Sequence, residues 1–240
     1  MQSDLFPELD KKTTIMGIIN LTPDSFSGDG LLNQAEAETA ALDQAIRFVE
    51  EGADVLDLGA ESTRPGSRKL NASEELDRLL PTLTLIRKEL PDVLISVDTY
   101  KAETARVCLE RGADIVNDVW GFQFDPRMAA VVAEYDATAV LMHNRESGAR
   151  PVSSELGGRY EDVEYEDIVG EVCAWLARSV EIARAAGVSD DKIILDPGIG
   201  FGKTIDQNLY LLKHLDALTE LGFPVLLGIS RKGFIGHTLN

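Results

Sequence analysis

Cysteine and histidine are scarce in this 240-residue sequence, which contains two cysteines and three histidines. Cys108 and Cys173 form no CxxC pair and lie in helix-like stretches, so we expect buried, reduced thiols rather than metal ligands. The histidines, His143, His214 and His237, are far apart, and no HExxH motif occurs. A zinc site is therefore not expected.

Long apolar runs are also missing. No stretch approaches the roughly 18 apolar residues that a transmembrane helix needs. The opening segment, MQSDLFPELDKK, has no apolar core of the kind found in signal peptides. We therefore expect a cytoplasmic protein with no membrane partner.

Basic residues are outnumbered, with 23 Lys and Arg against 41 Asp and Glu and a net charge of -18. Such a negative field repels nucleic acid and anionic membranes, so neither is expected as a partner. A small anionic substrate can still bind where a few Lys and Arg converge. The 44% hydrophobic content suits one globular domain, which we predict over residues 1–240.

Several well-known motifs are absent. The segment Gly198–Thr204 looks like a phosphate-binding loop, but Pro197 stands where that motif requires its first glycine. The same segment fails GxGxxG, because Lys203 replaces the last glycine. The first strand–helix turn has no GxGxxG either, and no GxSxG exists anywhere in the sequence. Dinucleotide binding of the Rossmann type and serine-based hydrolysis therefore have no support.

A repeating unit is present instead: a short apolar strand, a polar loop, an amphipathic helix and a glycine. Such alternation predicts a parallel sheet, and nearly continuous apolar strands are typical of sheets buried on both faces. The helix over Ala35–Glu51 carries a stripe of small and apolar residues, as expected for a helix that packs on a sheet. The expected strands are Thr14–Asn20, Val55–Gly59, Leu94–Thr99, Ile115–Val119, Ala139–His143, Ile193–Asp196 and Val225–Ser230.

Polar residues at the ends of these strands distinguish between two architectures. A doubly wound sheet gathers such residues near one switch point, whereas a barrel gathers them all around one mouth. Nearly every expected strand here ends on one, so we predict a (β/α)8 TIM barrel; the residues are Asn20, Asp57, Asp98, Asn117, His143, Asp196 and Ser230. Only seven strands are recognisable, so we expect that the eighth βα unit is missing and that the natural protein continues for roughly 30 to 45 residues.

Three of these polar strand ends, together with Lys232, suggest a binding site, although plainer interpretations exist. Asp98 and Asp196 end apolar strands, where a carboxylate either caps the next helix or meets a ligand. Asn117 can donate and accept hydrogen bonds together. Lys232 either reaches into the mouth or remains a solvated loop lysine. Together the Asp, Asn and Asp side chains suit a flat heterocycle with a donor and acceptor edge.

Two polar loops follow the first two expected strands. Asn20–Ser27 reads NLTPDSFS, and Gly59–Ser67 reads GAESTRPGS. In the second loop, hydroxyl groups beside an arginine and two glycines suit anion binding. Taken singly, the first loop is better explained as an ordinary turn and the second as a polar surface loop.

The order of seven motifs along the chain carries more information than any one of them. These are NLTPDSFS, DLGAESTRPG, SVDT followed by Lys101, NDVWG, Met142-His143, LDPGIGFGK and SRKGFIG. In this order, from residue 13 to about 236, the sequence resembles the dihydropteroate synthase family. The resemblance implies a barrel enzyme of folate biosynthesis that joins 6-hydroxymethyl-7,8-dihydropterin pyrophosphate to p-aminobenzoate and releases pyrophosphate.

The resemblance also implies roles for individual residues. Asp98, Lys232 and Asn20 would be catalytic, and Asn20 with Asp24 would hold a Mg²⁺ ion beside the pyrophosphate. The pterin would contact Asp98, Asn117, Asp196 and Lys232, with Met142 and Phe201 as pocket walls. The p-aminobenzoate and pyrophosphate would contact Phe26, Thr63, Arg64, Pro65 and Ser230. The family further implies inhibition by sulfonamides, and we expect a homodimer.

One departure from the family pattern keeps alternatives open. Members ordinarily carry an Arg-x-His element on the eighth strand, and nothing here matches it, because His237 lies too close to strand seven. A pterin-binding methyltransferase would share the barrel and the polar pterin face, but would not need Ser62–Pro65 or the first loop. A catalytically inactive pterin-binding paralogue is the other alternative.

Overall fold

Six parallel strands form the central sheet of the computed structural model, which describes residues 5–6, 11–22, 34–62, 68–145, 150–152 and 158–239. The strand order is β1-β2-β3-β4-β5-β8, and every neighbouring pair is parallel. Consecutive parallel strands require a crossover, which helices supply here. The strands are β1 Met16–Asn20, β2 Val55–Gly59, β3 Leu94–Asp98, β4 Ile115–Asp118, β5 Thr138–Met142 and β8 Ile193–Asp196.

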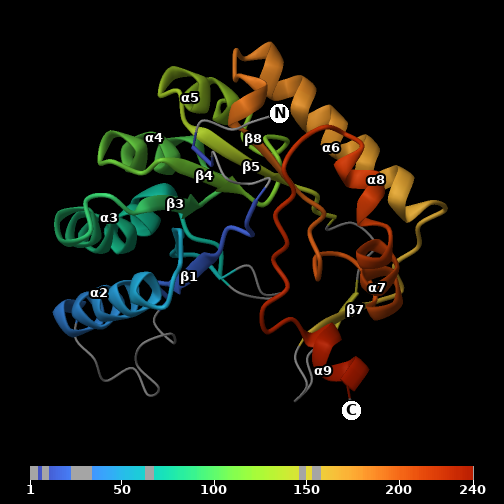
Figure 1. Cartoon of the computed structure of the whole chain (residues 1–240), viewed down its shortest axis with the longest axis horizontal. Coiled ribbons are helices and arrows are strands. Elements are labelled where there is room, and N and C mark those ends of the chain that lie inside the picture. Colours follow the sequence, from blue (N-terminus) through green and yellow to red (C-terminus); the bar gives the residue numbers. More distant parts are fainter. Residues whose placement is uncertain are drawn as a thin grey trace.

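Helices cover one face of this sheet, and Figure 1 shows α2 to α6 in an arc around its outside. The sequence explains where several of them begin. Asn71 and Glu74 form a capping box at the start of α3, and Thr204 with Gln207 does the same for α7. The helices are α2 Gln34–Glu50, α3 Ala72–Glu89, α4 Ala102–Glu110, α5 Met128–Glu134, α6 Ile168–Ala185, α7 Ile205–Lys213, α8 Leu215–Thr219 and α9 Gly233–Leu239, with a short 3-10 turn at Asp190–Lys192.

Two separate apolar cores lie on opposite faces of the sheet. The larger core fills the space between strands and helices, where Ile19 and Leu56 meet Ala41 of α2 and Leu83 of α3. The smaller one, which we call the inner cluster, contains Phe6, Val55, Ile115, Val140 and Ile194. Burial on both faces explains why the strands are almost continuously apolar.

The predicted seventh strand, Val225–Ser230, is wrong as a strand. Only Val225 forms a bridge, to Leu195 of β8, and Leu226 N donates to the Leu195 carbonyl at 2.8 Å. A ladder along this segment would need continued backbone pairing, and in the described part of the chain β8 offers it only at this point. The other six predicted strands agree with the observed ones to within two residues at each end.

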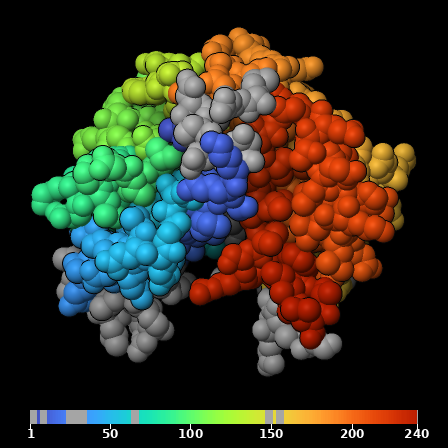
Figure 2. Space-filling view, viewed as in Figure 1, coloured from blue at the N-terminus to red at the C-terminus, as the bar shows by residue number. Residues whose placement is uncertain are grey.

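The first and last parts of the described sheet face one another. In Figures 1 and 2 the blue segment that contains β1 and the red segment around 225–230 meet in the middle of the molecule. Met16 of β1 and Leu226 both pack against the inner cluster. Four nearby apolar side chains remain exposed, namely Ile15, Ile18, Leu227 and Ile229. The sheet therefore curls in the way a barrel does, with β1 and β8 at its edges.

A small hairpin that the sequence did not predict follows β5. Strands β6 (Arg150–Val152) and β7 (Arg159–Glu161) pair antiparallel. Three-residue strands containing proline and charged side chains carry no apolar alternation, which is why periodicity does not reveal them. Figure 1 places β7 beside α7 and α9, and residues of this hairpin line a small cavity together with Lys232 and Phe234.

Candidate functional site at the carboxyl ends of the strands

Each inner-cluster residue on a strand is followed, two positions later, by a residue of the site. Side chains two apart on a strand share a face, so Asp57 follows Val55 on the inner face. Asn117 follows Ile115 in the same way, and Asp196 follows Ile194. The inner face is thus apolar at its base and polar at the carboxyl ends of the strands.

The strand register brings three predicted residues to one edge. Asn20 pairs with Gly59, and Gly59 pairs with Asp98. Asp98 in turn pairs with Asn117. A Cβ atom on Gly59 would lie 3.4 Å from Asp98 Oδ2 and 3.9 Å from Asn20 Oδ1. The glycine therefore leaves open space between an amide oxygen and a carboxylate oxygen, as glycines in strands do where a ligand approaches closely.

Asp98 is an acid whose pKa is strongly shifted by its surroundings. Burial raises its pKa well above the usual range, and the negative charges of Asp57, Glu75 and Asp118 raise it further. Lys232 acts in the opposite direction. Among the described residues no hydrogen bond contributes to this shift. Strong perturbation of this kind is typical of functional groups.

Asp57 lies one layer deeper and holds Asn117. Its Oδ1 accepts a hydrogen bond from Ser96 Oγ at 2.6 Å, and its Oδ2 accepts one from Asn117 Nδ2 at 3.2 Å. Asp57 is 5% exposed. Burial raises its pKa, while the two donors partly offset that effect. A buried carboxylate needs such donors, because an unpaired buried charge is costly.

Asp196 ends β8 on the opposite side of the same mouth. Its Oδ1 accepts a hydrogen bond from Gly198 N at 2.7 Å, and its backbone carbonyl accepts one from His143 N at 2.9 Å. Burial raises the pKa of Asp196 to about 6, although the backbone donor and the charges of Lys232 and Lys203 lower it. The carboxylate has capacity left to accept hydrogen bonds from a ligand.

Lys203 is fully buried beneath this strand end. Its Nζ contacts His143 Nδ1 at 2.9 Å and donates to the carbonyls of Gly198 at 2.9 Å and Phe201 at 3.0 Å. Burial lowers the pKa of Lys203 to about 7. Burial and the charge of Lys203 lower the pKa of His143 to about 2, so this ring is neutral. The Lys203 ammonium group therefore stabilises the 197–203 loop, whose carbonyls surround it.

Lys232 lies next to Phe201 and close to the two strand-end carboxylates. Its Nζ lies 4.0 Å from the centre of the Phe201 ring, a cation–π distance. Burial lowers its pKa, while Asp196 and Asp98 raise it. A Cβ on Gly200 would lie 2.9 Å from Lys232 Cδ, so that glycine makes room for the lysine stem. Ser230 is exposed.

Apolar side chains form the remaining wall. Met142 is buried with Tyr100 and Val119 in a third cluster, and Phe201 and Trp120 pack against it. The predicted walls, Met142 and Phe201, are thus brought together. An apolar wall next to a few convergent polar groups is typical of a small-molecule site.

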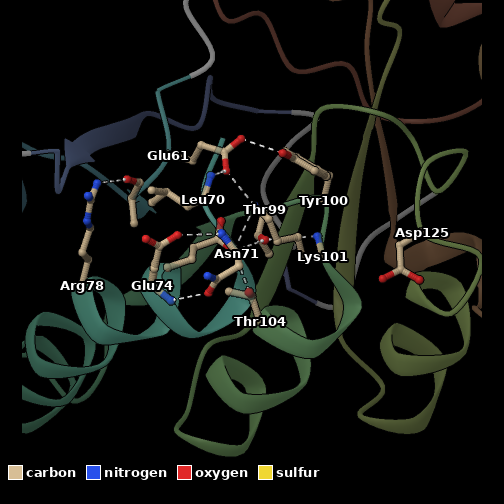
Figure 3. Close-up of polar contacts among 12 residues, drawn as sticks. Glu61, Leu70, Asn71, Glu74, Arg78, Thr99, Tyr100, Lys101, Thr104 and Asp125 are labelled. Carbon is tan, nitrogen blue, oxygen red and sulfur yellow. Dashed lines mark hydrogen bonds and ion pairs between the residues drawn. The ribbon is translucent and has the colours of Figure 1, made fainter. Parts of the chain in front are cut away.

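A carboxylate network, which Figure 3 shows, joins the base of the second predicted loop to the β3–α4 turn. Glu61 Oε1 accepts from Tyr100 OH at 2.6 Å, and Glu61 Oε2 accepts from Lys101 Nζ and Leu70 N, both at 2.8 Å. Arg78 donates to the carbonyl of Ala60 at 3.1 Å. One carboxylate therefore ties both ends of the 61–70 segment to the turn that follows Asp98.

A second buried acid extends this network. Glu75 Oε2 accepts from Thr104 Oγ1 at 2.6 Å and from Thr99 Oγ1 at 3.2 Å, and Lys101 Nζ lies 3.4 Å away. Burial raises the pKa of Glu75 despite these donors. Its charge is one of those that raise the pKa of Asp98.

Part of the predicted site lies outside the described residues: Asp24, Phe26, Thr63, Arg64 and Pro65. Within the described ranges, no group of three or more His, Cys, Asp and Glu side chains is placed to hold a metal ion. Across those ranges, no helix is long and apolar enough to cross a membrane. The cysteines are free, with Cys108 buried and Cys173 only half-buried.

Sequence reasoning missed the residues that support the site from behind. Ser96 lies inside a predicted strand, and Lys203 belongs to a segment that only partly matches a phosphate-binding loop. Glu61 was one letter of a polar loop. A charged or hydroxyl side chain inside an otherwise apolar strand was a usable signal for Ser96 and Asp57. Nothing in the local sequence shows that Lys203 is buried.

Comparison with known proteins identifies the family. The model of the pterin binding enzyme family matches residues 16–240. Dihydropteroate synthase from Clostridium beijerinckii is 42% identical over 230 residues, which cover 96% of this chain and 78% of that relative. The enzyme from Bacillus subtilis is 44% identical over 96% of this chain and 74% of its own length. A solved dihydropteroate synthase from Clostridium difficile, crystallised with pteroic acid, superposes with a TM-score of 0.85 at 43% identity, covering 95% of this chain and 80% of that one. The chain therefore belongs to the dihydropteroate synthase family of pterin-binding enzymes, transferases of folate biosynthesis.

Proposed function

We propose that this chain joins 6-hydroxymethyl-7,8-dihydropterin pyrophosphate to p-aminobenzoate at the mouth formed by the carboxyl ends of β1 to β5 and β8. The observation that carries the proposal is the convergence of Asp98, Asn117, Asp196 and Lys232 beside the apolar wall of Met142 and Phe201. Related proteins support it, since a Xanthomonas albilineans enzyme was solved in complex with 7,8-dihydropteroate and again with 4-aminobenzoic acid.

The charges of the site suit the pterin ring. Asp196, when ionised, accepts hydrogen bonds from the ring amino group and the adjacent N–H. Lys232 donates to the ring carbonyl and a ring nitrogen from the facing side. Asn117 offers both a donor and an acceptor. A ligand that lacks these groups leaves buried polar atoms unpaired, at a cost of about 1–3 kcal/mol each.

The chemical step is a substitution at the pterin methylene carbon. The lone pair of the arylamine nitrogen forms the new C–N bond, the C–O bond breaks with its electron pair leaving on pyrophosphate, and the amine loses one proton. Positive charge spreads into the ring as the C–O bond lengthens. A carboxylate at Asp98 stabilises that charge, and electrostatic stabilisation of this sort is usually a large part of catalysis.

Asn20 with Asp24 would hold a Mg²⁺ ion. The amide oxygen of Asn20 faces the gap above Gly59, with a carboxylate oxygen of Asp98 on its other side. Amide and carboxylate oxygens are the ligands that this hard cation prefers, so the donor chemistry of the described part fits. Bound there, Mg²⁺ supplies neutralising charge for the pyrophosphate leaving group.

The second substrate would contact Phe26, Thr63, Arg64, Pro65 and Ser230. Sulfonamides copy the shape of p-aminobenzoate and project beyond it, so we expect them to compete for the same place. Noncompetitive inhibition would contradict this assignment. A homodimer in solution is also part of the proposal, and sedimentation would test it.

An assay with both substrates and Mg²⁺ tests the function. Formation of dihydropteroate supports the synthase, and its absence together with intact pterin binding supports an inactive paralogue. Methyl transfer to or from a folate would instead favour the methyltransferase. The dihydropteroate synthases among the relatives, at 42–45% identity, favour the first outcome.

A further inference from the structure

Asn117 has an amide group whose two ends differ in hydrogen bonding but are nearly equal in shape. A ligand at the mouth therefore meets an acceptor or a donor according to how that amide is turned. Side chains on the two neighbouring strands, β2 and β3, fix the direction of the amide. The inference about that direction rests on the proposed function.

We propose that Asp57 is a positioning residue that turns the Asn117 amide so that its carbonyl oxygen faces the pterin. The contact between Asn117 Nδ2 and Asp57 Oδ2 is 3.2 Å. An ionised carboxylate only accepts hydrogen bonds, so it selects the NH₂ end of the amide. The Oδ1 atom and one N–H of Asn117 are then left for the ligand.

Ser96 completes the arrangement from the strand between them. Its hydroxyl proton is committed to Asp57 Oδ1 at 2.6 Å. Asp57 and Ser96 are directly paired in the β2–β3 ladder, so the backbone fixes this contact. With one oxygen occupied by Ser96, the other is aimed at Asn117 across the intervening strand. Ser96 is fully buried and Asp57 nearly so, which keeps water from replacing either partner.

The arrangement also explains why an acid, and not an amide, stands at position 57. Two donors converge on this side chain from two different strands. An asparagine here would offer one acceptor atom and one NH₂ group. Either its NH₂ group would face the Asn117 NH₂, or the Ser96 hydroxyl would have to turn and accept, and so give up its own bond to position 57. The negative charge of Asp57 also contributes to the raised pKa of the neighbouring Asp98.

The test is a double-mutant cycle on pterin binding, measured by calorimetry with 6-hydroxymethylpterin monophosphate, a ligand bound by the relative from Anaplasma phagocytophilum. We expect Asp57→Asn to weaken binding about tenfold, the equivalent of ~1.4 kcal/mol. Asn117→Ala should weaken it by a similar factor or more. The double variant should bind no more weakly than Asn117→Ala alone, because Asp57 acts through Asn117. If the double variant instead loses affinity by the product of the two single-variant factors, the two residues act independently and the proposal is wrong.

A variant in which the residues at positions 57 and 117 are exchanged distinguishes a loss of positioning from a loss of folding. In Asp57→Asn/Asn117→Asp the hydrogen bond re-forms with its direction reversed, so the melting temperature should match that of the wild type. The pterin would then meet carboxylate oxygens alone, and binding should remain at least tenfold weaker. Wild-type affinity in this exchanged variant would show that the direction of the amide is irrelevant.

The wild-type control separates this inference from the proposed function. Wild-type protein that binds no pterin contradicts the proposed function, whatever the variants do. In that case the side-chain NH₂ resonances of Asn117 still decide the positioning role, since Asp57→Asn should shift them by the loss of a charged acceptor. Unchanged resonances would overturn it.

Discussion

Asp196 illustrates how burial prepares a residue for a ligand at the cost of stability. Its folded-state pKa is about 6, above that of an unfolded aspartate, so the folded state binds a proton more tightly than the unfolded state does. Stability contributed by this group is therefore lost as the pH rises from about 4 to about 6. A bound pterin that donates hydrogen bonds to the ionised carboxylate favours the deprotonated form of Asp196 instead.

The first prediction concerns Asp196→Asn. We expect pterin binding to weaken by about 1–3 kcal/mol, because the amide nitrogen would face a ring donor. The melting temperature at pH 7 should stay level or rise, because no buried charge remains. Calorimetry and thermal unfolding measure the two effects. Asp92→Asn, the same exchange at an exposed turn, should change neither.

The pH dependence of binding checks the same assignment. Wild-type affinity should fall by up to about tenfold for each pH unit below about 6, because protonated Asp196 cannot accept from both ring donors. Lys232 and Lys203 are the cations near this group. In Asp196→Asn the fall should be much smaller. An equally steep fall in the variant would move the titration to another residue, and Asp98 is the first candidate.

At the scale of elements, the loop between β8 and α7 depends on one buried lysine. Three glycines of this loop, at positions 198, 200 and 202, have positive φ angles. Such a path has little intrinsic stability, because glycine loses the most conformational freedom on folding. The three contacts of the Lys203 ammonium group stabilise this loop conformation, which the backbone alone does not favour.

The second prediction is that Lys203→Met destabilises the fold by at least about 2 kcal/mol, since two carbonyls and a ring nitrogen lose their donor. The pKa of His143 should rise as well, because the charge of Lys203 is one cause of its low value. Urea unfolding and NMR titration of the imidazole measure these effects. Lys88→Met, on an exposed part of α3, is the matched control and should cost almost nothing.

The third prediction concerns the two ends of the 61–70 segment. The amide of Leu70 donates to Glu61 Oε2, so Glu61→Gln should speed hydrogen exchange at Leu70 by about tenfold or more. Glutamine keeps the shape but offers one acceptor to three donors. Exchange is measured on the peptide that contains Leu70.

Glu134→Gln provides the comparison for that experiment, because it breaks an exposed ion pair with Arg106 that has no contact with Glu61 or Leu70 among those described. It should leave exchange at Leu70 unchanged. If both variants leave that amide equally protected, the carboxylate of Glu61 does not hold the segment.

Elements were the level at which the sequence was most informative. Apolar strands followed by polar ends predicted β1 to β5 and β8, because burial on both faces leaves a plain signal. The segment 225–230 carries the same signal but makes only one bridge, since pairing depends on a neighbour that local sequence does not reveal. Asp98, Asn117, Asp196 and Lys232 were predicted as a set. Ser96 and Lys203 were not, and Asp57 was predicted only as one of the polar strand ends, because their roles arise from contacts between distant segments.

On the scale of the whole molecule, the sheet separates two apolar cores that differ in size and in what they support. The core between sheet and helices contains most of the buried apolar side chains. The inner cluster is small and lies directly below the polar layer that holds Asp57 and Asn117. Closely packed side chains transmit small displacements, so the inner cluster supports the geometry of the site as well as the fold.

The last prediction tests that inner support at Phe6, which is 8% exposed and packs against Val55, Ile115, Val140 and Ile194. Replacing it with alanine removes a large side chain from the base of the barrel, and we expect a loss of about 3 kcal/mol in the free energy of unfolding. Phe124→Ala, at a position that is 51% exposed, should cost less, about 1 kcal/mol, because its ring still contacts Tyr100 and Trp120. Urea unfolding of both variants gives the comparison. Equal effects would mean that Phe6 does not close the inner core, and that the strands alone hold the polar layer above it in place.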